Sequence, residues 1–159
     1  MQIIALAIDP LDGAPHVIAQ PHPEQPAFAI PVGLSDAPAI RAELLGIDLD
    51  RPLAHQLTVS LVQAAGASID CVELVAIDGA RVLASICVRA ADGTISLHDG
   101  RASDAVALAL CAKVPIWVAP HVIRDLSMRH LDPPLEWPDA DLPDSRRDRM
   151  VASASKWRG

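Results

Sequence analysis

The most uniformly apolar segment of the chain follows a short polar one. Residues 99–104 read D-G-R-A-S-D, whereas every residue from Ala105 to Ala112 is Ala, Val, Leu or Cys. A helix with no polar face belongs in the interior of a protein. The pattern therefore predicts a buried helix at the centre of the core, with three polar residues at its N-terminal end: Arg101, Ser103 and Asp104.

Hydrophobic periodicity predicts strands and helices along most of the chain. Asp12-Gly13 and Asp78-Gly79 have the composition of tight turns between paired strands. Ser35 or Asp36 is a suitable N-cap for the first helix. We predict strands over about residues 2–8, 16–20, 27–32, 69–77, 81–88, 94–98 and 114–118, and helices over about residues 36–45, 50–65, 104–112 and 120–129.

Two short motifs recur at nearly constant spacing. The triplet D-G-A occupies residues 12–14 and 78–80, and S-D-A occupies residues 35–37 and 103–105, which gives offsets of 66 and 68. Each half then consists of a hairpin, a third strand and two helices, which indicates an internal duplication. Chance recurrence of common residues is the alternative. In either case we expect an α+β fold with helices packed on a mixed sheet.

Composition divides the chain into one domain and a tail. Residues 1–131 are long enough for a single core, whereas residues 132–159 are rich in Pro and charge and are expected to be flexible. The net charge is −7, and the domain alone has 8 basic and 14 acidic side chains, a balance of −6. Because nucleic acids are bound mainly through Lys and Arg, this charge argues against a broad electrostatic interface with them. Contacts with nucleic acid would have to be local.

The cysteines and the N-terminus indicate a cytoplasmic protein. Cys71, Cys87 and Cys111 are odd in number and lie within apolar segments, which favours reduced thiols over a disulfide framework or a metal cluster. The N-terminal ten residues have no basic region before their apolar run, so we expect a first strand and not a signal peptide. No segment reaches the roughly 20 apolar residues that cross a bilayer, and no membrane association is expected.

Asp104 and Arg101 are candidates for binding a cation and a phosphate, respectively. A carboxylate such as Asp104 can hold a divalent cation together with substrate phosphate. Its structural alternative is to cap the buried helix or to interact with the helix dipole. Arg101 can bind a phosphate through two donors at the helix N-terminus, or it can pair with Asp99 or Asp104. Both alternatives stay open for each residue.

His55 and Ser103 complete the set of polar residues with possible chemistry. His55 has a side chain that titrates near neutral pH and can act as a general acid or base. It lies at the margin of an apolar helix face, so a hydrogen-bonded structural histidine is the alternative. Ser103 is expected to cap the buried helix rather than to act as a nucleophile, because no adjacent base or nucleophile-elbow motif accompanies it.

Four ordered blocks of the sequence resemble the bifunctional nuclease domain proteins of bacteria and plants. The family usually has P-I-W-I-G-x-x-E-A-x-A-I, R-P-L-T-H-D-L and D-A-R-P-S-D-A-I-A-L-A at three of the blocks. The corresponding segments here are Ile30–Ile40, Arg51–Leu57 and Asp99–Leu110, followed by Val114–Ala119. This chain departs from the usual residues at Asp36 for Glu, Ala54 for Thr, Gln56 for Asp, Gly100 for Ala and Ala102 for Pro.

The resemblance implies a homodimeric α+β protein that hydrolyses phosphodiester bonds of DNA and RNA. In a mechanism assisted by Mg²⁺ or Mn²⁺, Asp104 would hold the cation or orient water, and His55 would move a proton. Asp36 would join Asp104 as a metal ligand if the two repeats face a shared groove. Substrate would be bound by Arg101, Arg51 and Ser103. The alternative function is a non-catalytic, dimeric regulatory protein that binds an anionic ligand or a protein partner.

Overall fold

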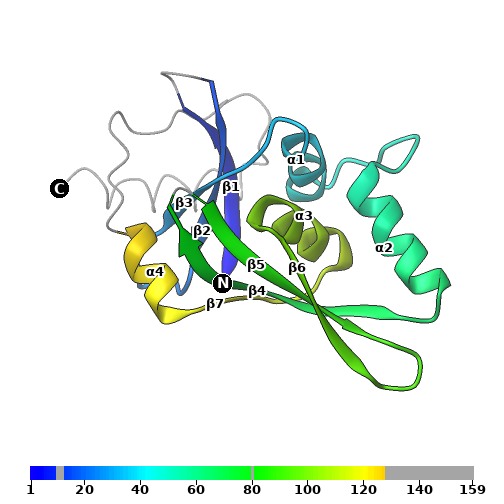
Figure 1. Ribbon diagram of the computed structural model, residues 1–159. Coiled ribbons are helices and arrows are strands. Elements are labelled where there is room, and N and C mark those ends of the chain that lie inside the picture. The colour runs from blue at the N-terminus through cyan, green and yellow to red at the C-terminus, as the bar shows by residue number, and fades with distance from the viewer. Residues whose placement is uncertain (10–12, 80, 128–159) are drawn as a thin grey trace.

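In the computed structural model, which describes residues 1–9, 13–79 and 81–127, the strands form two sheets (Figure 1). The first is antiparallel, in the order β1-β2-β3, and the second has the order β6-β5-β4-β7, with β4 and β7 parallel. The predicted α+β class and mixed sheet are confirmed, although the strands do not join in one sheet. The strands are β1 (Gln2–Ile8), β2 (Pro15–Gln20), β3 (Phe28–Pro31), β4 (Ser68–Asp78), β5 (Arg81–Arg89), β6 (Ile95–Arg101) and β7 (Ile116–Val118).

The helices lie close to their predicted positions. The described residues contain α1 (Ala37–Leu45), α2 (Ala54–Ala64), α3 (Ala102–Ala112) and α4 (Pro120–Ser127). Helix α2 begins four residues later than predicted, because Pro52 disfavours helical backbone at Arg51 and the N-cap residue Leu53 is extended. None of the described helices is both long and apolar enough to span a bilayer. The predicted end of the last helix and the tail lie outside the described residues.

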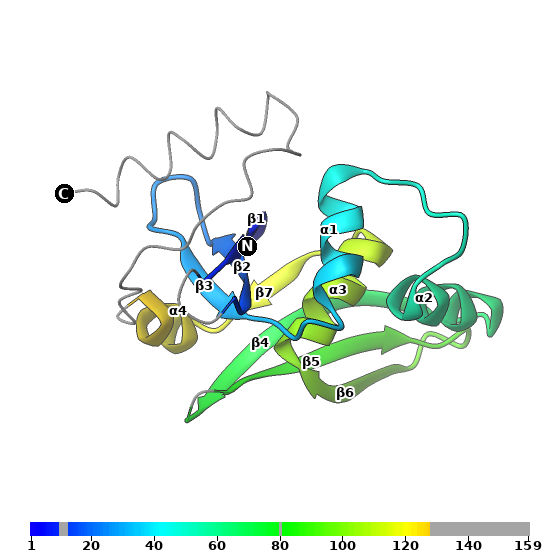
Figure 2. The same ribbon diagram turned by 90° about the horizontal axis from the view of Figure 1, so that it is seen from above.

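Helix α3 is at the centre of the main hydrophobic core, as predicted. It contacts α1 and α2 on one side and β4 and β5 on the other, and Figure 2 shows all three helices on the same side of the larger sheet. Seven of its eleven residues are buried: Ala102, Ser103, Ala105, Val106, Ala107, Leu108 and Ala109. Its many alanines let the surrounding elements approach closely, in keeping with a chain that has few aromatic residues.

The halves of the chain share only part of their element order. In each half, three strands precede a helix that has a site residue near its N-terminus, namely Asp36 before α1 and Asp104 in α3. After these helices the halves differ, because α2 follows α1 whereas β7 comes between α3 and α4. The duplication therefore stays a prediction.

The three cysteines are free thiols. Cys71 and Cys87 lie opposite each other on β4 and β5. Burial raises the pKa of the Cys111 thiol to about 12, with a further contribution from the nearby carboxylate of Glu43. Burial also raises the pKa of the Cys71 thiol, so Cys71 and Cys111 are neutral side chains of the fold rather than ready nucleophiles.

Candidate metal centre at three helix N-termini

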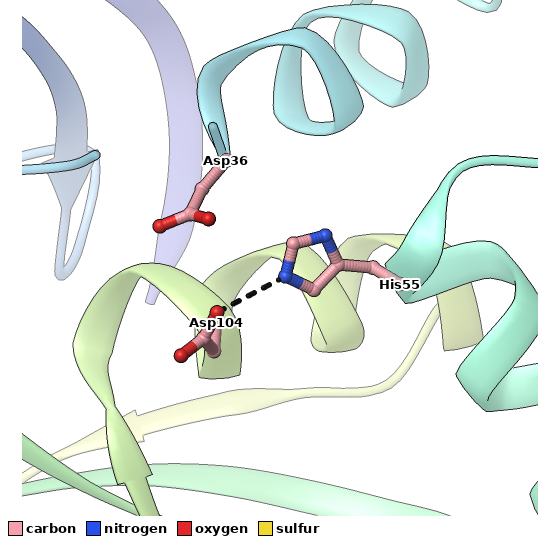
Figure 3. Close-up of side chains that lie close together, drawn as sticks. All are labelled: Asp36, His55 and Asp104. Carbon is pink, nitrogen blue, oxygen red and sulfur yellow. Dashed lines mark hydrogen bonds and ion pairs between the residues drawn. The ribbon is translucent and has the colours of Figure 1, made fainter. Parts of the chain in front are cut away.

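The N-termini of α1, α2 and α3 bring three potential metal ligands together (Figure 3). Asp36 is the N-cap residue of α1, His55 is the second residue of α2, and Asp104 is the third residue of α3. The N-terminal end of a helix has a positive potential from its dipole and its free N–H groups. Three such ends near one point favour carboxylates there, and they also favour an anionic ligand.

The three side chains are close enough to share one cation. One potential ligand atom from each of them lies within 4.8 Å of the others, and His55 Nε2 is 3.2 Å from Asp104 Oδ1. Ligands about 2.1 Å from a Mg²⁺ or Mn²⁺ ion are roughly 3–4 Å apart, so small side-chain movements suffice. Two carboxylates and an imidazole form a donor set that suits a divalent cation. The side chains thus fit a metal centre.

Asp36 carries the clearest sign of an unmet interaction. Asp36 is only 3% exposed, and its Oδ1 accepts a hydrogen bond from Ser35 Oγ at 2.9 Å. Its Oδ2 is buried and accepts no hydrogen bond from any described residue. A buried carboxylate oxygen without a donor is costly, because it loses hydration without replacement. Its nearest cationic partner is Arg101 Nη2, at 3.5 Å, which is an ion pair but too long for a good hydrogen bond.

Gly33 leaves the space into which the Asp36 side chain folds. The carbonyl oxygen of Gly33 accepts a hydrogen bond from the backbone N–H of Ala37 at 3.1 Å, which forms a helical turn ahead of α1. A Cβ atom at Gly33 would lie 3.0 Å from Asp36 Oδ2, closer than side-chain atoms normally approach. Any other residue at this position would therefore require the carboxylate to shift by a few tenths of an ångström.

Arg101 and Asp104 form a two-point ion pair. Arg101 Nε donates to Asp104 Oδ2 at 2.7 Å, and Nη2 donates to Oδ1 at 2.8 Å. These bonds from Arg101 are the main reason why the pKa of Asp104 is lowered, with His55 adding to the effect and partial burial opposing it. The same interaction raises the pKa of Arg101, assisted by the charges of Asp104 and Asp36. Asp104 is therefore an ionised carboxylate at neutral pH.

The contact with Asp104 orients the ring of His55. An ionised carboxylate only accepts hydrogen bonds, so the nitrogen that faces it, Nε2, is the one assigned the hydrogen. The side chain of His55 is only 12% exposed, and no described residue bonds to its Nδ1. In this tautomer Nδ1 has the lone pair, so binding of a cation through Nε2 would require the hydrogen to move to Nδ1.

Gln56 holds the first turn of α2 in place beside the centre. Its Oε1 accepts a hydrogen bond from the backbone N–H of Leu53, and its Nε2 donates to Glu43 Oε1 of α1, both at 2.9 Å. The bond to the N-cap residue satisfies a backbone group that the helix cannot satisfy itself. Gln56 thus links α1 to α2 next to His55. The family usually has Asp at this position.

Replacing Gln56 by Leu is expected to lower the free energy of unfolding by about 2 kcal/mol, since two hydrogen bonds are lost at roughly 1 kcal/mol each. Gln56→Glu keeps an acceptor for Leu53 but has no donor for Glu43. At neutral pH its free energy of unfolding should therefore fall by at least about half as much as that of Gln56→Leu. Urea denaturation measures both changes. Gln63→Leu, at an exposed position of the same helix, is the control. Equal midpoints for Gln56→Leu and the control would contradict this role.

The structure brings together four of the predicted site residues, namely Asp36, His55, Arg101 and Asp104. Of the two partners considered for Arg101, Asp104 is the one observed. Arg51 is exposed four residues before His55 and makes no hydrogen bond or ion pair to the described residues. Its role in binding substrate stays a prediction.

Ser103 does not cap α3, and that prediction was wrong. The N-cap position belongs to Arg101, with no side-chain cap, and Ser103 is a buried residue within the first turn. The helix begins two residues earlier because Arg101, the last residue of β6, is already extended and can start it directly. With only 6% of Ser103 exposed, its hydroxyl group has little access to a substrate.

Sequence reasoning missed Gly33 and the positioning role of Gln56. A glycine three residues before an acidic residue at a helix start was the available sign for Gly33, because glycine permits the close approach of other groups. Gln56 stands three residues after Leu53, at the spacing of a side chain that bonds to the N-cap backbone.

Comparison with known proteins agrees with the blocks seen in the sequence. Two uncharacterized proteins, from two strains of Mycobacterium tuberculosis, are each 34% identical to this chain over 97 residues, which are 61% of this chain and 57% of theirs. The chain thus spans little more than half the length of these relatives. The bifunctional nuclease domain matches residues 17–130, a range that includes the whole centre. The chain therefore belongs to the bifunctional nuclease domain family.

Proposed function

We propose that this protein hydrolyses phosphodiester bonds of DNA and RNA with the help of a divalent cation held by Asp36, His55 and Asp104. The observation that carries the proposal is the buried Oδ2 of Asp36, which lies beside the other two side chains and accepts no hydrogen bond from the described residues. A cation would supply the partner that this oxygen lacks. Membership of the bifunctional nuclease domain family supports the choice of reaction.

The side chains divide the work of hydrolysis as follows. Arg101 binds the phosphate together with free N–H groups at the start of α3, because a guanidinium group matches two phosphate oxygens. As a ligand, His55 would give the one lone pair of its neutral ring to the cation, so the proton of the attacking water passes to solvent. A bound divalent cation would neutralise charge on the phosphate and favour ionisation of water. Arg51, which is exposed, is a further candidate for substrate contacts.

The donor set favours Mn²⁺ over Mg²⁺. Mg²⁺ prefers oxygen ligands and holds its waters strongly, whereas transition metals such as Mn²⁺ accept an imidazole nitrogen beside carboxylates more readily. With two carboxylates and one imidazole, the centre provides both kinds of ligand. Mn²⁺ is therefore the cation that we expect to give the higher activity.

Cleavage assays with the purified full chain test this proposal. Fluorescently labelled single-stranded and double-stranded DNA and RNA are incubated with Mn²⁺, with Mg²⁺ or with a chelator. Cleavage is expected with Mn²⁺ and should disappear both with the chelator and in Asp104→Ala. A folded protein that cleaves none of the four substrates would contradict the proposal. Cleavage that survives both controls would come from a contaminant or another site.

The second candidate is a non-catalytic protein that binds an anionic ligand or a protein partner. It is favoured by the ion pair between Arg101 and Asp104, which already satisfies much of the charge in the centre. The net charge of −7 also disfavours broad contact with nucleic acid. Binding of an anion without turnover would distinguish this candidate from the nuclease. The homodimer and the cytoplasmic location stay predictions for either function.

A further inference from the structure

The guanidinium group of Arg101 spans the two carboxylates of the centre. It donates two hydrogen bonds to Asp104, and its Nη2 also lies 3.5 Å from Asp36 Oδ2. The negative charge of the two carboxylates is thus partly balanced by a side chain of the protein itself. A cation bound to Asp36 and Asp104 would compete with Arg101 for the same oxygens and the same negative charge.

The two ends of this interaction differ in how firmly they are held. The side chain of Arg101 is 66% exposed, so water replaces its contacts easily and the ion pair with Asp104 adds little stability. Asp36, in contrast, is buried, and its Oδ2 obtains no hydrogen bond from Arg101. The guanidinium group is therefore a weakly held and incomplete partner for the carboxylates.

We propose that Arg101 is an exchangeable substitute for the divalent cation. In the cation-free protein it partly neutralises Asp36 and Asp104, and cation binding displaces it. The released guanidinium group stays at the N-terminus of α3, where it binds a substrate phosphate, a second step that rests on the proposed nuclease function. Cation binding thereby prepares the protein for its substrate, and the order of binding is cation first.

The exchange predicts that loss of Arg101 strengthens cation binding. In Arg101→Gln the competing charge is gone, so Mn²⁺ should bind about fivefold more tightly than to the wild type, as expected for removal of one exposed ion pair. Arg101→Lys keeps the charge but cannot contact both oxygens of Asp104 at once, so its affinity should lie between the two. If Arg101 only ordered Asp104 for cation binding, both variants would bind Mn²⁺ more weakly.

Isothermal titration of the full chain with MnCl₂ measures these affinities, with circular dichroism to verify folding. Arg89→Gln is the matched control, because it removes an equal charge from another carboxylate pair, that with Asp70, and should leave the affinity unchanged. Tighter binding by Arg101→Gln, with Arg101→Lys intermediate, supports the exchange. Unchanged or weaker binding by Arg101→Gln overturns it, as does the absence of Mn²⁺ binding by the wild type.

A second titration tests the step that involves substrate. The fluorescence anisotropy of a labelled phosphorothioate oligodeoxynucleotide, with Mn²⁺ present, should show about tenfold weaker binding to Arg101→Gln than to the wild type. Equal binding would overturn this step. The exchange and the nuclease function fail in different ways. Tighter Mn²⁺ binding without any cleavage by the wild type removes the nuclease function alone, whereas Mn²⁺-dependent cleavage without tighter binding removes the exchange alone.

Discussion

Asp104→Asn is expected to lower the rate of phosphodiester cleavage by at least about 100-fold, because even the outer partners of metal ligands contribute 10- to 100-fold. Asn has the size of Asp and keeps one oxygen, but it has no charge to attract a cation. The variant also loses one of the two oxygens that accept hydrogen bonds from Arg101. Saturable Mn²⁺ binding should disappear together with activity.

Stability is expected to change much less than activity in this variant. Arg101 lowers the pKa of Asp104, so the ion pair stabilises the fold above the ordinary pKa of an Asp and is lost as the pH falls through the lowered value. Because the side chain of Arg101 is mostly exposed, loss of the ion pair at neutral pH should lower the free energy of unfolding only slightly. Urea denaturation at neutral and acidic pH measures this difference.

Asp99→Asn is the matched control for Asp104→Asn. Asp99 is an exposed residue of β6, two positions before Arg101. Its substitution by Asn removes the same charge as Asp104→Asn but changes no residue of the centre. It should retain both activity and Mn²⁺ binding. If Asp104→Asn were as active as the wild type and Asp99→Asn in parallel assays, the reaction would take place elsewhere on the chain.

Ala107→Leu is expected to lower the free energy of unfolding by about 3 kcal/mol, the upper part of the usual range for overpacked cores. Ala107 is fully buried in α3, and that helix contacts α1, α2, β4 and β5. Because Ala107 is fully buried, the larger leucine side chain has no free space, and either α3 or its neighbours must shift. For a domain of this size the melting temperature should fall by roughly 10 °C.

Ala64→Leu separates packing from helix propensity in this experiment. Ala64 is exposed at the end of α2, so the same substitution there changes the melting temperature little. Thermal denaturation followed by circular dichroism measures both variants. If Ala107→Leu melted together with this control, α3 would have more free space around it than its burial indicates.

Local patterns were enough to predict most of the fold. The uninterrupted apolar run of α3 predicted its burial, and alternation with Asp-Gly turns predicted the hairpin of β4 and β5. The separation into two sheets could not be predicted, because it depends on which distant strands pair, such as β7 with β4. The apolar side expected for α2 was also only partly buried, since Leu57 and Leu61 are exposed and Val59 is its one buried residue.

The candidate site was predictable in its members but not in its contacts. The recurring S-D-A motif led to the hypothesis that Asp36 and Asp104 face each other, and their side chains do lie close together. Partners are set by tertiary packing, which sequence spacing does not show. The ion pair of Arg101 with Asp104 was one of two alternatives, and the unpartnered oxygen of Asp36 had no sign in the sequence.

The convergence of three helix N-termini couples the centre to the stability of the whole domain. Asp36 and Asp104 are 68 residues apart in the sequence, so an unfolded chain does not hold them near each other or near His55. Any cation that binds the centre therefore binds the native state almost exclusively and shifts the unfolding equilibrium by mass action. At 100 times its dissociation constant it would add about 2.7 kcal/mol to the free energy of unfolding. The melting temperature thus becomes a direct measure of how fully the centre is occupied.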